Sequence, residues 1–253
     1  MSTVFITGAT AGFGRATALL FAENGYDVVI TGRRNEKLQA LKAEIEKKYA
    51  RKVEALCFDV RNLTEVKTAI ENLPANFKNI DILINNAGLA AGVSPINEGN
   101  TDDWERMIDT NIKGLLYVTR CIAPLMVNQK HGHIINVGSA TGKEVYPNGN
   151  VYCGTKFAVD ALNKAMRIDL VSHNIKVSAI HPGMAETEFS IVRFAGDEEK
   201  AKNVYKGLTP LSAEDIAETI YWMATRPKHV NINELSIMAT QQASATIAVR
   251  NNS

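Results

Sequence analysis

Short runs of apolar, mostly β-branched residues recur along the chain, separated by stretches in which apolar positions follow helical spacing. Most of these runs are continuously apolar rather than alternating, as expected for parallel strands that are covered on both faces. We therefore predict seven strands, at Val4–Thr7, Asp27–Thr31, Val53–Phe58, Ile80–Ile84, His133–Val137, Lys176–Ile180 and Leu235–Met238.

The segments between these runs carry the signals of helices. Asn24-Gly25 is a typical pair at a helix end, and Leu38, Leu41 and Ile45 recur at helical spacing. The predicted helices are Gly14–Ala22, Glu36–Tyr49, Leu63–Asn72, a long segment from Thr101 to about Asn128 that Gly114 and Pro124 interrupt, Val151–Val171 and Ala213–Ala224.

Alternating strands and helices predict an α/β fold, because a crossover helix between parallel strands packs on one face of the sheet. We expect a single-domain, Rossmann-type, doubly wound parallel sheet of about seven strands with helices on both faces. No linker-like stretch divides residues 1–253, so one domain is expected. A long insertion at about 182–210 breaks the rhythm, and its length is typical of lids and binding loops.

Charge and composition narrow the choice of partners. The net charge is +1 and both signs are mixed along the chain, which argues against nucleic acid and anionic membranes. Small molecules or further copies of the chain are the expected partners. We find no signal peptide and no membrane-spanning run, and expect a cytoplasmic protein. Cys57, Cys121 and Cys153 lack metal-ligand spacing and are interpreted as packing residues in a reducing compartment.

The first predicted strand runs directly into a glycine-rich turn, and a helix follows. Glycines let such a turn tighten, approach a pyrophosphate and pack against the helix, whose N-terminus attracts phosphate. We predict a dinucleotide-binding turn whose contacts come from Gly8, Thr10, Gly12, Phe13 and Gly14.

Arg33 and Arg34 end the second predicted strand, where an NAD site usually places an acidic residue for the ribose 2′-hydroxyl. Two guanidinium groups suit a 2′-phosphate instead, and this favours NADP(H). The alternative is a pair of solvated surface arginines.

Tyr152 and Lys156 lie four residues apart and share a face if the segment is helical. Tyrosine is a poor acid–base catalyst near neutral pH because its pKa is near 10. A neighbouring ammonium group favours the phenolate and is expected to lower that pKa. This pair is a candidate proton-transfer group.

Further motifs follow the later strands in order: Asn85-Asn86-Ala87-Gly88, Ser139 and Pro182-Gly183. With the glycine turn and the Tyr152–Lys156 pair, they make the chain resemble the short-chain dehydrogenase/reductase family from Val4 to at least Met238. The resemblance implies that Tyr152 is the general acid/base, that Lys156 lowers its pKa and holds the nicotinamide ribose, and that Ser139 polarises the substrate carbonyl. It also implies that Asn111 supports a proton-relay water near the lysine.

The same resemblance implies further cofactor contacts. Asp59 and Val60 correspond to the adenine contact, and Asn86, Ala87 and Gly88 to the segment along the adenosine ribose. Pro182, Gly183 and Thr187 correspond to the turn at the nicotinamide end. Asn85 is either a cofactor contact or a residue that joins strands. His133 and His181 are interpreted as structural, and no metal site is expected.

Within the family, the chain is most similar to NADP-dependent 3-hydroxy acid dehydrogenases acting on serine, L-allo-threonine and related acids. The similarity includes Thr187-Glu188-Phe189-Ser190, Val192-Arg193-Phe194 and His229-Val230-Asn231-Ile232-Asn233. Arg193 is the candidate cation for the substrate carboxylate, beside Ser139 and Tyr152 at the reacting oxygen. Glu144 or Glu188 is the candidate for an ammonium group.

Other readings remain open. The same chemistry on a 3-ketoacyl thioester, a sugar or a bulky ketone is one alternative, and a catalytically silent dinucleotide sensor is another. The resemblance also implies a homotetramer built on paired long helices and the C-terminal strand.

Overall fold

The structure, a computed structural model, describes residues 2–251. Its strands form one parallel sheet of seven in the order β3-β2-β1-β4-β5-β6-β7. The order reverses beside β1, which is the mark of a doubly wound sheet, and the predicted fold is confirmed. The strands are β1 (Thr3–Ile6), β2 (Asp27–Gly32), β3 (Val53–Cys57), β4 (Ile82–Asn85), β5 (Gly132–Val137), β6 (Ile175–Pro182) and β7 (Glu234–Ile237).

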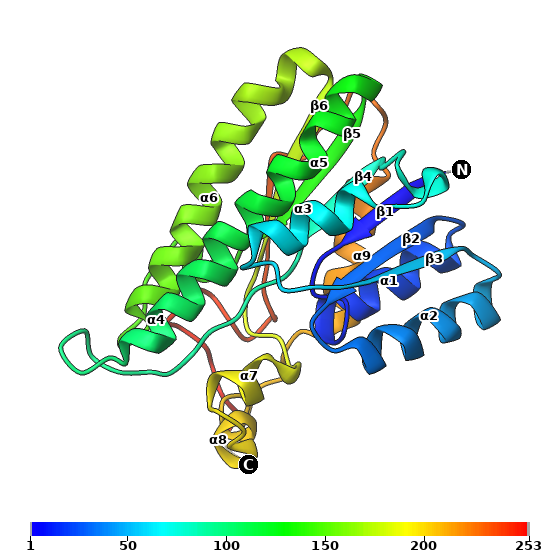
Figure 1. Ribbon diagram of the computed structural model, residues 1–253. Coiled ribbons are helices and arrows are strands. Elements are labelled where there is room, and N and C mark those ends of the chain that lie inside the picture. Colours follow the sequence, from blue (N-terminus) through cyan, green and yellow to red (C-terminus); the bar gives the residue numbers. More distant parts are fainter. Residues whose placement is uncertain (1, 252–253) are drawn as a thin grey trace.

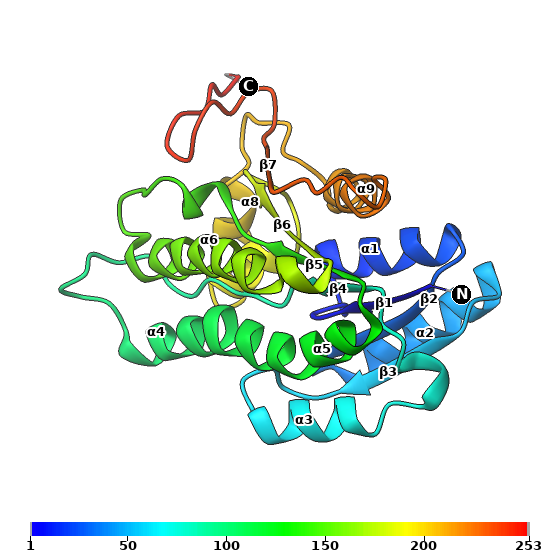
Figure 2. The ribbon, with the colours of Figure 1, turned by 90° about the horizontal axis from the view of Figure 1, so that it is seen from above.

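Helices cover both faces of the sheet (Figures 1 and 2). Val4 and Ile6 of β1 join the core under α1 (Gly12–Glu23), α2 (Asn35–Tyr49) and α9 (Ala213–Ala224). Phe5 joins the opposite core, under α3 (Leu63–Glu71), α5 (Leu115–Gln129) and α6 (Asn150–Leu170). Successive strand side chains point to opposite faces, so a strand buried on both must be apolar throughout.

The predicted long helix is continuous from Thr101 to Gln129, and its expected breaks are absent there. α4 (Thr101–Ile108) passes through a π-helical segment, Asp109–Gly114, into α5, which contains Pro124. Gly114 serves packing instead of ending the helix, since a Cβ there would lie 2.7 Å from the Val60 side chain. The wider π-helical turn carries Asn111, and such segments are frequent at functional sites.

The insertion contains two short helices, α7 (Glu188–Arg193) and α8 (Glu198–Asn203), at the carboxyl edge of the sheet (Figure 1). The C-terminal segment lies beside them, where the Asn251 amide donates to the Gly207 carbonyl. Short 3₁₀ helices occur at Ala75–Phe77, Ala140–Gly142 and Val171–His173.

All three cysteines are free. Cys153 is buried, as expected of a packing residue, but Cys57 at the end of β3 is exposed, so its interpretation as a packing residue is wrong. The sequence pattern did not indicate this exposure, because it does not show that β3 lies at the edge of the sheet.

Within residues 2–251, no helix has both the length and the apolar character needed to cross a bilayer.

Asn85 joins strands and does not line the cavity described below. It is buried, and its Nδ2 donates to Asn136 Oδ1 on β5 and to Thr119 Oγ1 on α5, both at 2.9 Å. A buried amide with such partners ties β4 to its neighbours. The structural alternative for Asn85 is therefore the one that the geometry supports.

Asn85→Ala should lower the free energy of unfolding by about 1–3 kcal/mol, because Asn136 and Thr119 lose a buried partner. Urea denaturation would measure it, with Asn97→Ala in an exposed loop as control. Equal stability of the two variants would show that the Asn85 contacts do not hold the sheet.

Candidate active site

The turns at the carboxyl ends of the strands line a cavity of about 540 Å³, within the size range of small-molecule sites. Gly14 and Asn111 are not part of its lining. The lining contains these residues singled out from the sequence: Gly8, Thr10, Gly12, Phe13, Arg33, Arg34, Asp59, Val60, Asn86, Ala87, Gly88, Ser139, Tyr152, Lys156, Pro182, Gly183, Thr187 and Arg193.

The glycine-rich turn needs its glycines. Gly8 and Gly12 have φ of 68° and 51°, in the left-handed region that favours glycine. A Cβ on Gly14 would lie 2.5 Å from the Gly8 carbonyl oxygen and from the Asn86 side chain. α1 starts here without a side-chain cap and without an acidic residue in its first turn. Its N–H groups and positive dipole end suit an anion.

Asn86 ties the end of β4 to this turn. Its Nδ2 donates to the carbonyl oxygens of Thr7 (2.8 Å) and Gly8 (3.2 Å). In return, Thr7 Oγ1 accepts from the Asn86 and Ala87 amides at 3.0 and 2.9 Å. Asn86 thus shapes the turn as well as lining the cavity.

Arg34 is anchored at the rim of the cavity. Its Nε and Nη2 donate to Thr10 Oγ1, and its Nη1 lies 2.8 Å from Glu188. Lys37 also pairs with Glu188 at 2.8 Å, and these hydrogen bonds lower the pKa of Glu188. Two cationic side chains, Arg34 and Lys37, therefore lie next to the end of β2. Lys37 was not identified from the sequence.

Arg33 points to Asp59 instead of Glu188, with 3.8 Å between Arg33 Nη1 and Asp59 Oδ2. Asp59 forms a bidentate pair with Arg61, whose guanidinium donates to both carboxylate oxygens at 2.6–3.0 Å. Burial raises the pKa of Asp59, but the hydrogen bonds from Arg61 outweigh it, so the pKa is lowered. Asp59 is therefore an ionised, firmly held acceptor in the lining.

Ser139, Tyr152 and Lys156 come together below this rim. Ser139 lies two residues beyond the end of β5, and its Oγ accepts from the Thr141 amide (3.1 Å) and hydroxyl (2.9 Å). Tyr152 and Lys156 lie one turn apart on α6, with Lys156 Nζ 6.0 Å from the tyrosine ring centroid. Lys156 Nζ donates to the Val137 carbonyl at 3.0 Å. All three predicted residues are buried.

Desolvation dominates the proton equilibria of this group. Burial raises the pKa of Tyr152, and hydrogen bonding to Ser139 and the Arg193 charge only partly oppose it. Burial therefore outweighs the lowering of the tyrosine pKa that a neighbouring ammonium group was expected to cause. Burial also lowers the pKa of Lys156 to about 8, which leaves it mostly protonated at neutral pH.

Asn111 lies behind the lining, in the π-helical segment. Its Nδ2 donates to the Leu89 carbonyl (2.8 Å) and to Thr155 Oγ1 (3.0 Å), and its Oδ1 accepts from the Leu89 amide. These contacts connect the segment after β4 to α6. A Cβ on Gly88 would lie 3.3 Å from Asn111 Oδ1 and 3.5 Å from Lys156 Nζ, so Asn111 is close to the lysine.

The insertion contributes the opposite wall. Arg193 Nη2 donates to Tyr146 Oη at 2.6 Å, and its guanidinium carbon lies 5.9 Å from the Tyr152 ring centroid. Arg193 Nε is buried and has no hydrogen-bond partner within the described chain. Phe189 packs on Tyr152 with ring centroids 5.7 Å apart. Arg193 therefore lies next to the candidate proton-transfer group.

Both carboxylates considered for a substrate ammonium group have other partners. Glu188 pairs with Arg34 and Lys37, and Glu144 accepts from the Ala245 amide at 3.0 Å. Sequence reasoning also missed Tyr146 and Thr141. Tyr146 gives a faint signal six positions before Tyr152, whereas nothing in the sequence marks Thr141.

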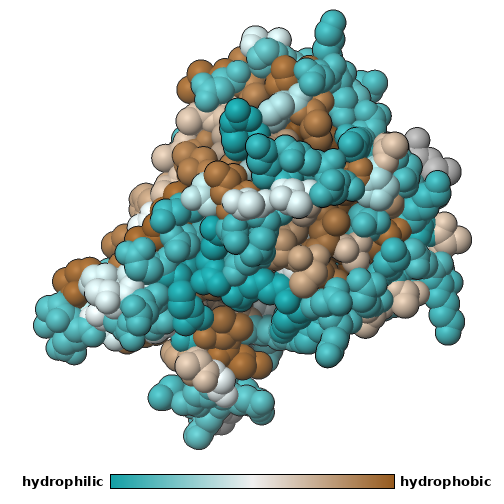
Figure 3. Space-filling view, in the orientation of Figure 1, coloured by the Kyte–Doolittle hydropathy of each residue, from teal (hydrophilic) through white to brown (hydrophobic). Residues whose placement is uncertain are grey.

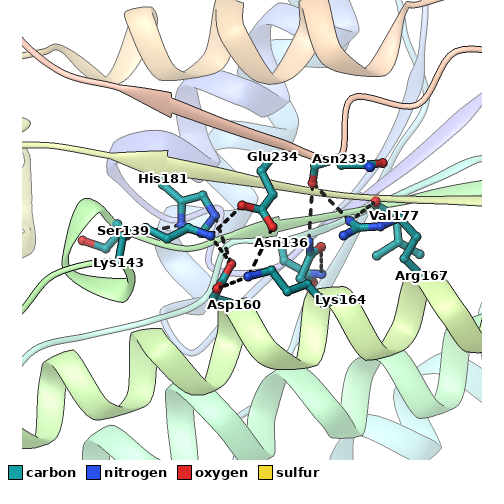
Figure 4. Close-up of polar contacts among 11 residues, drawn as sticks. Asn136, Ser139, Lys143, Asp160, Lys164, Arg167, Val177, His181, Asn233 and Glu234 are labelled. Atoms are coloured by element: carbon teal, nitrogen blue, oxygen red, sulfur yellow. Dashed lines mark hydrogen bonds and ion pairs between the residues drawn. The ribbon is translucent and has the colours of Figure 1, made fainter.

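One group of side chains brings metal-ligating residue types together, which the sequence spacing did not indicate. Asp160, His181 and Glu234 have ligand atoms within 4.8 Å of one another, although they lie far apart in the sequence (Figure 4). Ammonium groups already balance the carboxylates. Lys143 Nζ lies 2.6 Å from both Asp160 and Glu234, and Lys164 Nζ lies 2.7 Å from Asp160.

Comparisons with known proteins agree with this site. The chain is 47% identical over 247 residues to an NADP-dependent 3-hydroxy acid dehydrogenase of Salmonella typhi, covering 97% of this chain and 98% of the relative. It is 44% identical to a serine 3-dehydrogenase of Agrobacterium fabrum, covering 98% and 97% of the two chains. Both matches extend across the glycine turn, the Tyr152–Lys156 pair and the insertion.

Solved structures agree as well. The closed form of a serine dehydrogenase complexed with NADP+ superposes with a TM-score of 0.92 and 44% identity, covering 99% of this chain and all of the other. A serine dehydrogenase from Escherichia coli gives 0.82 and 41%, with 95% and 99% covered. The family model described as short chain dehydrogenase matches residues 2–197. The chain therefore belongs to the short-chain dehydrogenase family.

Proposed function

We propose that the protein is an NADP(H)-dependent oxidoreductase that oxidises the 3-hydroxyl group of small 3-hydroxy acids such as serine, L-allo-threonine and 3-hydroxyisobutyrate. The observation that carries the proposal is the convergence of Ser139, Tyr152 and Lys156 with Arg34 and Arg193 on one cavity. The relatives named above support the choice of cofactor and substrate class.

The cavity suits a dinucleotide with a 2′-phosphate. The turn around Gly8 and Gly12 leaves room for a pyrophosphate at the start of α1, and Arg34 and Lys37 supply charge for the phosphate. When bound, NADP+ supplies the hydride acceptor and NADPH the hydride donor. Other residues that would hold the cofactor are Thr10, Phe13, Gly14, Arg33, Asp59, Val60, Asn86, Ala87, Gly88, Lys156, Pro182, Gly183 and Thr187.

Ser139 is prepared to donate a hydrogen bond. Its Oγ already accepts two hydrogen bonds from Thr141, so its own proton is left for another acceptor. A substrate oxygen between Ser139 and Tyr152 would receive two hydroxyl donors as negative charge develops on it. Tyr152 then exchanges the proton with this oxygen.

Lys156 and Asn111 support that proton exchange. Burial keeps Tyr152 in its protonated form, which is the form that donates a proton to an alkoxide. Removing a proton from an alcohol requires the phenolate, and the Lys156 ammonium one turn away favours it. Asn111 fixes the segment beside Lys156, consistent with a role in a proton relay.

Arg193 is the proposed ligand of the substrate carboxylate. Its buried Nε–H has no hydrogen-bond partner among residues 2–251, and an unpaired buried donor is costly unless a ligand satisfies it. Its Nη2 can remain on Tyr146 Oη at the same time. A 3-hydroxy acid could then reach Arg193 with its carboxylate and Tyr152 with its hydroxyl.

We also propose that the enzyme is a cytoplasmic homotetramer. Leu116 on α5, Phe157 and Ile168 on α6 and the nearby Val171 are exposed apolar side chains, and Figure 3 shows hydrophobic patches along this side of the molecule. Exposed apolar side chains along the long helices favour association between copies. The three free cysteines fit a reducing compartment.

Tyr152→Phe should lower kcat by about 10²–10⁴-fold, the usual contribution of a positioned proton-transfer group. NADPH affinity, followed by nicotinamide fluorescence, should change little, because the phenyl ring keeps its packing on Phe189. A variant that retains most of its kcat would remove Tyr152 from the proposed role.

Arg34→Ala should raise the KM for NADP+ by about tenfold or more, since a charged hydrogen bond is lost, while the KM for NAD+ stays the same. Arg15→Ala is the matched control, because Arg15 has the same 45% side-chain exposure and also pairs with a glutamate. If both cofactors respond equally to Arg34→Ala, the arginine does not read the 2′-phosphate.

Arg193→Ala should raise the KM for 3-hydroxyisobutyrate by about tenfold or more, because the carboxylate loses its cation. The KM for the methyl ester of the same acid serves as control and should stay nearly constant. An unchanged KM for the acid would exclude Arg193 as the carboxylate ligand.

A further inference from the structure

A cluster of charged side chains lies outside the cavity lining, directly behind the turn that carries Ser139 (Figure 4). Lys143, at the end of this turn, contacts carboxylate oxygens of Asp160 on α6 and Glu234 on β7 at 2.6 Å each. Lys164, one helical turn beyond Asp160, contacts it at 2.7 Å. The cluster therefore joins the serine turn to α6 and to the edge of the sheet.

His181 on β6 lies between this cluster and Ser139. It is completely buried, and its Nδ1 is 3.2 Å from the Ser139 carbonyl oxygen. A Cβ on Gly138 would lie 2.6 Å from the same nitrogen, so the imidazole packs directly against the backbone that precedes Ser139. A carbonyl oxygen only accepts, which requires the proton to be on Nδ1.

The other ring nitrogen faces Asp160. Nε2 is 3.6 Å from Asp160 Oδ1 and makes no hydrogen bond within residues 2–251. Lys143 and Lys164 balance the Asp160 charge, and Lys143 together with burial lowers the pKa of His181. The contact with the Ser139 carbonyl thus places the proton on Nδ1, and the lowered pKa keeps the ring neutral, which leaves Nε2 without a proton on the side of Asp160.

The same contacts hold Ser139 against the helix that carries its partners. Tyr152, Lys156 and Asp160 follow one another at four-residue intervals on α6, and so share a face. A Cβ on Gly142 would lie 2.6 Å from the Lys156 carbonyl oxygen, so the serine turn packs on this face. A shift of the turn would therefore change the distance from Ser139 to Tyr152.

We propose that His181 is a positioning residue for Ser139: its Nδ1–H fixes the serine carbonyl, and the Lys143–Asp160–Glu234 cluster holds the imidazole and the far end of the turn. The expected effect of His181 on kcat rests on the proposed function, whereas the expected protonation of its ring at Nδ1 does not. His181 thus has a role beyond the structural one expected from the sequence.

Two substitutions separate the hydrogen bond from the bulk of the ring. His181→Asn places an amide donor where Nδ1 lies, whereas His181→Gln moves the donor to the Nε2 position. We expect His181→Gln to lower kcat by about tenfold, as misplaced catalytic groups do, with little change in the KM for NADP+. His181→Asn should recover most of the lost rate.

The matched control is His133, a second buried histidine, whose Nε2 lies 2.7 Å from Ser178 Oγ. His133 is at the start of β5, and Ser139 follows the other end of that strand. His133→Gln should alter the melting temperature but not kcat. Equal kcat for His181→Asn and His181→Gln, or an equal loss in His133→Gln, would overturn the positioning role.

A measurement on the protein without substrate keeps the proposal testable if 3-hydroxy acids prove not to be turned over. The ¹⁵N chemical shifts of His181, assigned by comparison with His181→Asn, should show a neutral ring protonated at Nδ1 at neutral pH. A ring protonated at Nε2 would overturn the proposal, whatever the enzyme's substrate.

Discussion

All seven strands run parallel, and this constraint determines where ligands can bind. Because every strand ends at the same edge of the sheet, the turns after β1, β2, β3, β4, β5 and β6 converge on one cavity. The first turn lies so close to α1 and to the end of β4 that position 14 has no room for a side chain. Asn86 then fixes that approach through the carbonyl oxygens of Thr7 and Gly8.

The cavity combines two demands that oppose each other. Proton transfer needs a group whose pKa lies within reach of the working pH, yet burial moves the pKa of Tyr152 away from it. Burial also brings the pKa of Lys156 down to about 8, which weakens the hold of this ammonium group on its proton. The protein meets the cost with fixed partners, such as the Val137 carbonyl for Lys156 and Thr141 for Ser139. Because these partners fix Lys156 and Ser139 in place, both donors can stabilise charge that develops on the substrate oxygen without first reorienting.

Sequence patterns predicted the seven strands and the glycine turn well, because a strand buried on both faces must be apolar and a pyrophosphate turn must contain glycine. They also placed Ser139, Tyr152 and Lys156. Contacts between distant segments were out of their reach: Glu188 meets Arg34 across 154 residues, and Lys143 meets Glu234 across 91. The sequence predicted the long segment from Thr101 but not its π-helical part or its continuity through Gly114, where the packing against Val60 overrides the local helix-breaking signal.

The most direct test of the account is the initial rate of nicotinamide reduction at alkaline pH with L-serine, L-allo-threonine and 3-hydroxyisobutyrate, each with NADP+ and with NAD+. The account predicts turnover of at least one of these acids with a clear preference for NADP+. Turnover that favours NAD+, or none with any of the three acids while NADPH still binds, would contradict it.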